Sequence, residues 1–326
     1  MNCTDNALNV LTANTYKGIG NAWIVKNMHG DASIDTLVML LSATAKEHVS
    51  LHDFGQRKQQ IQRRLESHAA HIDGVVAIGD ALFPAYRGVV KHSEQPVALF
   101  YRGDIRLIAN TNNTVAVIGL LNPDADTVEF ENTVVSALVA QGVTIVSGLA
   151  MGCDAVAHRQ ALHAGGRTVA ILPSPLSDIL PHANRDLAAL IVQHDGLLIS
   201  EYLESAHSKM ELSGRYVARD RLQALFSNAV VLTASYAEND QGHDSGSRHA
   251  MAYALAYGIP RAVIYDAQRH QHNPTYELNR QLIHADTHII VIDAATMTAT
   301  VTQIATAPGA TSATRDTWVQ RGMFGE

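Results

Sequence analysis

A regular alternation of short apolar runs with segments of helical periodicity is the feature that most constrains the fold of this chain. Each run is bounded by glycine, aspartate or proline, as is typical of strands that are buried on both faces. Strands separated by helices predict a parallel sheet covered by helices on both sides, which is a doubly wound α/β fold. The runs lie at 115–119, 144–148, 168–172, 196–200, 229–233 and 262–266.

Further elements extend this pattern toward both ends of the chain. Strands are also predicted at 75–78, 97–100 and 287–293. Helices are predicted at 126–141, 154–164, 246–257 and 279–285. The first three of these helices are each followed by glycine, the residue that most often ends a helix because it adopts the left-handed conformation without strain. The sheet is therefore expected to be mostly parallel.

Three segments follow from the change of periodicity along the chain. Residues 1–71 have helical patterning, with a stripe of leucines on 37–41, and predict a small helical accessory domain. Within it, 17–22 is either the hairpin of a helix-hairpin-helix or SAM-like unit, where backbone N–H groups meet phosphate, or a plain glycine turn. Residues 72–293 form the predicted core. Residues 294–326 are rich in alanine and threonine and predict a short tail with no room for a winged-helix domain.

Composition excludes several classes of protein. Of the 326 residues, 47% are hydrophobic and 17% charged, no apolar run is long enough to span a membrane, and no secretory signal is visible, which predicts a cytoplasmic protein. Cys3 and Cys153 are too far apart for a zinc site, and no HExxH motif is present, so neither metal nor cofactor is expected. The net charge of −7 restricts any nucleic-acid site to a local patch.

Three loops that follow predicted strands are candidate ligand sites, because ligands of open α/β sheets bind beyond the carboxyl ends of the strands. The first contains Gly119, and the second runs from Ser147 to Asp154 and contains Gly148 and Gly152. The third contains Ser245, Gly246, Ser247 and Arg248. Glycines and helix N-termini expose N–H groups that bind anions. None of the loops has the spacing of GxGxxG or of a P-loop, so each is either a phosphate contact or only a capping turn.

Charged residues near these loops leave two interpretations open. Arg219 and Arg221 flank Asp220 shortly before the strand at 229–233, either as a phosphate-binding pair or as a solvated basic face. Glu201 and Glu238 are candidate acids or bases, polar ligand contacts, or partners of a neighbouring arginine. The stretch 242–246 does not match the GxSxG nucleophile elbow, and no nucleophile with a neighbouring base is recognisable. The sequence therefore predicts no catalytic residue.

Several motifs follow one another in order between residues 74 and 293. They are Gly79–Pro84, Gln95–Gly103, Ser147–Asp154 with the reading SGLAMGCD, Gly165–Leu172, Pro181 with Asn184, Ser200–Tyr202, Tyr216–Leu222, Ser245–Ala250 and Asn279–Ile283. In these motifs and their order the chain resembles the DprA/Smf family of DNA-processing proteins.

The resemblance implies a Rossmann-like core that binds and protects single-stranded DNA and passes it to the RecA recombinase in recombination or natural transformation. It further implies a homodimer that is not an enzyme. The residues expected at the DNA site are Gly119, Gly148, Gly152, Asp154, Arg219, Arg221, Ser245, Gly246, Ser247 and Arg248. Asn184, Glu201 and Glu238 are expected as additional polar contacts.

The chain departs from the family pattern at four places. Leu121 and Met151 stand where the family commonly has arginine, and Asp220 stands between two arginines where the family has RNR. The predicted tail leaves out the winged-helix domain. Fewer cations at the site mean fewer phosphate contacts and a weaker dependence of binding on salt.

Two other functions remain open on the sequence. The first is a nucleotide-binding sensor or a phosphoribohydrolase-like protein of the same fold, for instance in phage defence or stress, although the PGGxGT motif of phosphoribohydrolases is absent. The second is an interaction protein that keeps the fold as a scaffold. The loss of the two family arginines favours the scaffold interpretation.

Overall fold

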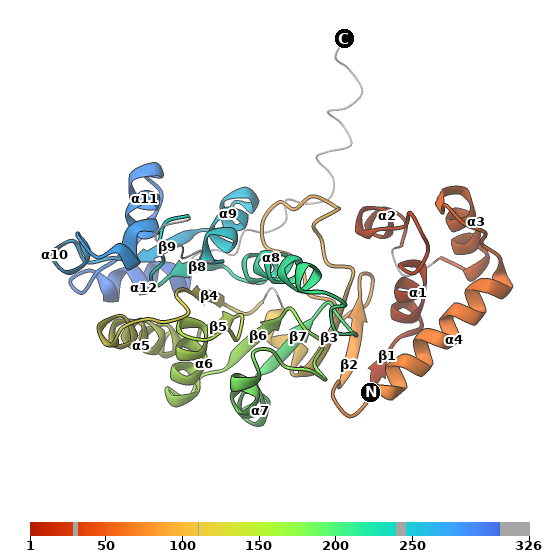
Figure 1. Ribbon diagram of the computed structural model, residues 1–326, viewed down its shortest axis with the longest axis horizontal. Helices are drawn as coiled ribbons and strands as arrows, with labels where there is room; N and C mark the ends of the chain where they lie inside the picture. Colours follow the sequence, from red (N-terminus) through yellow and green to blue (C-terminus); the bar gives the residue numbers. More distant parts are fainter. Residues whose placement is uncertain (29–31, 110, 239–245, 307–326) are drawn as a thin grey trace, which may run out of the picture. The chain divides into compact units, whose positions relative to one another are not determined.

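Every strand predicted from the sequence is present in the structure, a computed structural model that describes residues 1–28, 32–109, 111–238 and 246–306 (Figure 1). The predicted α/β class with mostly parallel strands is confirmed. Contacts divide the chain into two units. The first unit contains 1–83, 90–109 and 169–219, and the second contains 84–89, 110–168 and the residues from 220 onward. This division mixes the segments that the sequence separates, so the domain boundaries at 71 and 293 stay a prediction.

Strands of the first unit lie in the order β1, β2, β3, β7 and β6. Their bounds are Asn2–Cys3 (β1), Gly74–Ala77 (β2), Ala98–Gly103 (β3), Leu197–Ser200 (β7) and Thr168–Leu172 (β6). Strand β3 is antiparallel to both of its neighbours, and the other pairs are parallel. Strand β1 was not predicted, because two residues are too short to show a period in the sequence.

The N-terminal helices of the first unit are α1 (Asp5–Ala13), α2 (Asn21–Asn27), α3 (Ile34–Thr44) and α4 (Leu51–Ser67). Helices α1, α3 and α4 begin after Thr4, Ser33 and Ser50, whose hydroxyl groups each accept a backbone N–H of the first turn. Helices α1 and α4 lie side by side (Figure 1). The predicted helical segment is therefore present.

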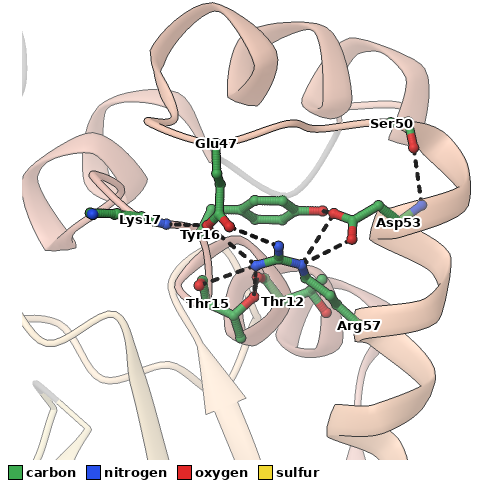
Figure 2. A network of polar contacts seen from close by, with 8 residues as sticks. All are labelled: Thr12, Thr15, Tyr16, Lys17, Glu47, Ser50, Asp53 and Arg57. Atoms are coloured by element: carbon green, nitrogen blue, oxygen red, sulfur yellow. Dashed lines mark hydrogen bonds and ion pairs between the residues drawn. The ribbon is translucent and has the colours of Figure 1, made fainter.

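A polar network fixes the turn between α1 and α2 against α4 (Figure 2). The Arg57 guanidinium lies 4.0 Å above the ring of Tyr16 and pairs with Glu47 at 3.0 Å and Asp53 at 3.1 Å. The Tyr16 hydroxyl donates to Asp53 at 2.7 Å, and the Lys17 N–H donates to Glu47 at 2.5 Å. A carboxylate of the chain itself thus engages the Lys17 N–H of the glycine turn. The helix-hairpin-helix interpretation of this turn stays a prediction.

Strands of the second unit lie in the order β5, β4, β8, β9 and β10, and all of their pairs are parallel. Their bounds are Thr144–Ser147 (β5), Thr114–Ile118 (β4), Ala229–Leu232 (β8), Arg261–Ile264 (β9) and Ile290–Ile292 (β10). The chain enters this sheet at β4, continues to β5 on one side, and later to β8, β9 and β10 on the other. The boundary between β4 and β8 is therefore a topological switch point, where open α/β sheets bind ligands.

Helices of the second unit cover both faces of these strands. Helices α5 (Ala125–Ala140), α6 (Cys153–His163) and α12 (Met297–Thr306) form one core cluster with β4, β5, β8, β9 and β10. Helix α9 (Ser247–Tyr257) lies on the other side (Figure 1). Residues 297–306 are part of this core, because Val301, Ile304 and Ala305 are buried, whereas the sequence predicts only a tail. Its many threonines hide the helical period.

The remaining helical elements connect the strands. They are η1 (Ile105–Ile108), η2 (His182–Asn184), α7 (Arg185–Gln193), α8 (Lys209–Leu225), α10 (Ala267–His270), η3 (Pro274–Tyr276) and α11 (Glu277–Ala285). Within the described ranges, no helix is long and apolar enough to cross a membrane. Nor do the described residues bring together three or more His, Cys, Asp or Glu side chains that could hold a metal ion.

Candidate functional site

The loops after β4, β5 and β8 meet at the switch point of the second unit. The Cys153 N–H at the start of α6 donates to the Leu120 carbonyl at 2.9 Å, which ties the loop after β5 to the loop after β4. The Ser247 hydroxyl at the start of α9 donates to the Gly119 carbonyl at 3.0 Å, which ties the third loop to the first. The first two loops that the sequence singles out and the described end of the third are thus adjacent in space.

Gly119 is needed for packing between two of these loops. A Cβ atom at this position would lie 2.7 Å from the sulfur of Cys153 and 3.2 Å from the Ala234 carbonyl. Cys153 is fully buried, and burial together with the nearby Glu131 raises the pKa of its thiol well above the usual range. The absence of a side chain at Gly119 therefore lets the end of β4 contact α6, a different role from the predicted contact with phosphate.

Asp154 holds the loop after β5 in an uncommon conformation. Its carboxylate accepts the N–H groups of Gly148 and Ala150, both at 3.2 Å. These residues flank Leu149, whose φ of 60° is rare for a residue with a branched side chain. The carboxylate thus offsets the strain at Leu149 and occupies N–H groups that the sequence interpretation assigns to an anion.

Gly152 permits the closest approach between the loops after β4 and β5. Its φ of +73° lies in the left-handed region, and a Cβ atom would lie 2.2 Å from the Leu120 carbonyl oxygen and 2.4 Å from that of Leu121. The neighbouring side chains of Leu121 and Met151 are 58% and 45% exposed. The two positions at which the resemblance expects arginine are therefore adjacent, and both carry exposed apolar side chains.

Acidic and basic side chains both lie near the start of α9, where the third loop ends. A Cβ atom at Gly246 would lie 3.5 Å from a carboxylate oxygen of Asp220, so a buried acid stands beside the first turn of this helix. Arg248 pairs with Glu238 at 3.1 Å, and both side chains reach solvent. Ser245 lies outside the described residues.

The arginines of α8 are buried. Arg215, Arg219 and Arg221 are each less than 10% exposed, so they do not form a solvated basic face. Arg215 pairs with Glu211 at 2.6 Å and donates to the Glu204 carbonyl at 2.7 Å. Arg219 lies over the ring of Tyr216 at 5.8 Å. The assignment of Arg219 and Arg221 to phosphate stays a prediction.

Predicted site residues are divided between the two units. Asn184, Glu201 and Arg219 belong to the first unit. The predicted residues of the second unit that the structure describes are Gly119, Gly148, Gly152, Asp154, Arg221, Glu238, Gly246, Ser247 and Arg248. Most of this second group surrounds the switch point.

Glu131 on α5 is a buried acid beneath the site that sequence reasoning did not find. Its side chain is fully buried, and the Cys153 thiol and the Thr233 hydroxyl lie beside its carboxyl group. Burial raises the pKa of this carboxyl well above its usual range, and the charge of Asp154 adds to the increase. An acidic residue in a helical pattern is normally predicted to lie on the surface, so the sequence does not indicate that Glu131 is buried.

Comparison with known protein families shows to which family the chain belongs. The model of the DNA recombination-mediator protein A family matches residues 74–304. The chain belongs to this family, DprA. The match includes the switch point and all the predicted site residues. It also extends through α11 and most of α12, beyond the predicted end of the core.

Sequence relatives match this DprA-family chain over part of their length. It is 39% identical to Protein Smf of Synechocystis over 139 residues, which are 42% of this chain and 34% of the relative. It is 33% identical to the DNA processing protein DprA of Streptococcus pneumoniae over 139 residues, which are 43% of this chain and 47% of the relative. The chain thus spans about a third to a half of these curated relatives.

Solved structures share the fold. The X-ray structure of DprA from Streptococcus pneumoniae matches 89% of this chain and 95% of its own with a TM-score of 0.65 at 22% sequence identity. DprA from Helicobacter pylori, described for its single-stranded DNA binding mode, matches 68% of this chain and 92% of its own with a TM-score of 0.55 at 27% identity. The Rossmann-like architecture expected from the resemblance is confirmed.

Proposed function

We propose that this DprA-family chain binds single-stranded DNA at the switch point of its second unit. The observation that carries this proposal is the family match across residues 74–304, which contains the adjoining loops after β4, β5 and β8. Its structural relative from Helicobacter pylori is described as a single-stranded DNA binder. Arg248 is a partly exposed cation beside these loops, and a single strand that passes there would meet it.

The wider role proposed for the chain is that of a recombination mediator in the cytoplasm. It would protect single-stranded DNA and assist its transfer to the RecA recombinase, without catalysing a reaction. No nucleophile and base are recognisable in the sequence of the loops, which supports a binding role. A nucleotide sensor of the same fold remains the second candidate, and the experiment below separates the two.

Arg248 and Glu238 offer a test with opposite expected effects. Arg248→Ala removes this partly exposed cation, and we expect about three- to tenfold weaker binding of a labelled oligothymidylate, as for the loss of one charge-assisted contact. Glu238→Gln removes the carboxylate that faces Arg248, and we expect tighter binding. Fluorescence anisotropy at two salt concentrations measures both, and the salt slope should fall by about 0.7 in Arg248→Ala.

The control for these variants is a substitution that changes charge elsewhere in the second unit. Glu129→Gln on the exposed surface of α5 should leave DNA affinity unchanged. If the native protein does not bind single-stranded DNA even at low salt, the proposal is wrong. A nucleotide that raises the melting temperature of the protein would then favour the sensor function.

We also propose that the chain forms a homodimer through α11 and β10. Strand β10 is the last strand of its sheet and pairs with β9 on one side only within the described ranges. In α11, Leu278, Leu282 and Ile283 are only half-buried, and Asn279 is the buried residue of this helix. A partly exposed apolar helix face and a strand that pairs on one side only each suit a two-fold contact between identical copies.

Leu282→Arg tests the dimer. A charge placed in an apolar contact is costly to bury, so we expect the mass in solution to fall from that of two chains to that of one. Light scattering after size exclusion measures this mass. Gln281→Arg adds the same charge at a neighbouring exposed position of α11 and should leave the dimer intact. A native protein with the mass of one chain would contradict the proposal.

A further inference from the structure

Groups that would attract a phosphate at the switch point are already engaged by carboxylates of the chain. Asp154 accepts the N–H groups of Gly148 and Ala150. Asp220 lies beside Gly246 at the first turn of α9, where the helix dipole favours an anion. Glu238 pairs with Arg248. Phosphate would therefore have to compete with Asp154 for these N–H groups and with Glu238 for Arg248, and it would meet the negative charge of Asp220 nearby.

Exposed apolar side chains border the same loops. Leu121 follows β4 and Met151 follows β5, and the Leu121 carbonyl lies against Gly152, the chain neighbour of Met151. Leu121 and Met151 together form what we call the apolar edge. Tyr236, which follows β8 and is half-buried, packs against the cluster that contains Leu120 and Cys153. Apolar surface is thus contributed from each of the three strands that meet at the switch point.

We infer that the apolar edge is a contact surface for a nucleobase of single-stranded DNA, an inference that rests on the function proposed above. A base is a flat, uncharged group, and a contact through its face needs apolar surface and none of the N–H groups that the carboxylates occupy. Methionine suits such a surface because its flexible thioether makes favourable contacts with aromatic rings. Exposed leucine and methionine beside paired charges therefore fit a base better than a phosphate.

A base contact at the apolar edge predicts how the affinity for DNA depends on salt concentration and on the presence of bases in the strand. Each phosphate contact contributes about −0.7 to the slope of log affinity against log salt for single strands, whereas a base contact contributes little. Binding at the apolar edge should therefore depend strongly on the presence of bases and weakly on salt. A strand with the same phosphates but no bases should bind poorly.

The experiment compares a labelled oligothymidylate with an abasic strand of the same length. The native protein should bind the oligothymidylate about three- to tenfold more tightly than the abasic strand, in keeping with the free energy of a thioether contact with an aromatic ring. Leu121→Ser combined with Met151→Ser should remove most of this preference. Leu255→Ser, which removes an equally exposed leucine two turns into α9, should retain it.

A second variant changes the mode of binding. Leu121→Arg adds a cation at the apolar edge, so it should strengthen binding of the abasic strand and steepen the salt slope by about 0.7. Both variants alter exposed side chains, and their circular dichroism and melting temperature should match those of the native protein.

The outcomes separate this inference from the proposed function. Equal affinity of the native protein for both strands, or an unchanged preference in the double serine variant, would overturn the base contact and leave DNA binding in place. If neither strand binds at low salt, both the inference and the proposed function are wrong. If the double serine variant changes the mass in solution and not the preference, the apolar edge is a contact between copies of this chain.

Discussion

Gly152→Ala is expected to destabilise the second unit by more than about 4 kcal/mol, a range that single substitutions seldom reach. Two costs combine. Gly152 has φ 73° and ψ −130°, a conformation that is almost exclusive to glycine and that costs about 1–3 kcal/mol for other residues. The new Cβ would also lie 2.2 Å and 2.4 Å from two backbone carbonyl oxygens, which cannot rotate away as a side chain can. The loops after β4 and β5 would have to separate.

Gly258→Ala is the matched control for this substitution. Gly258 has the same φ of 73°, with ψ 26°, and no atom lies within 4 Å of a Cβ built there. Its replacement should cost only the left-handed penalty of about 1–2 kcal/mol. Urea unfolding of both variants measures the difference. Equal losses of unfolding free energy would show that the close approach of the two loops contributes nothing.

Much of the fold could be predicted from the sequence because its elements are regular. The strands are continuous apolar runs between turn residues, and the predicted strand at 168–172 coincides with β6. Helix ends were predicted within one residue where a glycine follows, as at Gly258 after α9. Helix α12 was missed because its buried face is made of Val301, Ile304 and Ala305 among threonines. Division into units depends on contacts distant in sequence, which no local pattern reveals.

The sequence predicts where the candidate site lies, and it predicts only part of what the residues of the site do. Parallel strands bring their carboxyl ends to one edge, so the adjacency of Gly119, Gly152 and Ser247 follows from the order of the elements. What those residues do depends on distances in space. The sequence does not show that Asp154 would engage the N–H groups around Leu149, or that Arg219 and Arg221 would be buried.

Glu131→Gln is expected to make the protein more stable at neutral and alkaline pH. Burial raises the pKa of the Glu131 carboxyl well above its usual range in the folded state, whereas in the unfolded chain the pKa is about 4.3. Between these two values the folded state binds more protons than the unfolded state. The stability of the native protein therefore falls as pH rises from the unfolded value through the folded one.

Glutamine has nearly the same shape as the protonated glutamate and cannot ionise, so this substitution removes the pH-dependent loss without opening a cavity. Unfolding free energies from urea titrations between about pH 4 and about pH 8 should coincide for the two proteins at the acid end and diverge as pH rises, with Glu131→Gln the more stable. Glu129→Gln, an exposed change two residues earlier on α5, should follow the native curve. Parallel curves for native protein and Glu131→Gln would mean that Glu131 is ionised in the folded state, with a partner for its charge. Cys153 and Thr233 lie beside this carboxyl. Such a partner would therefore have to lie among the buried side chains beneath the loops of the switch point.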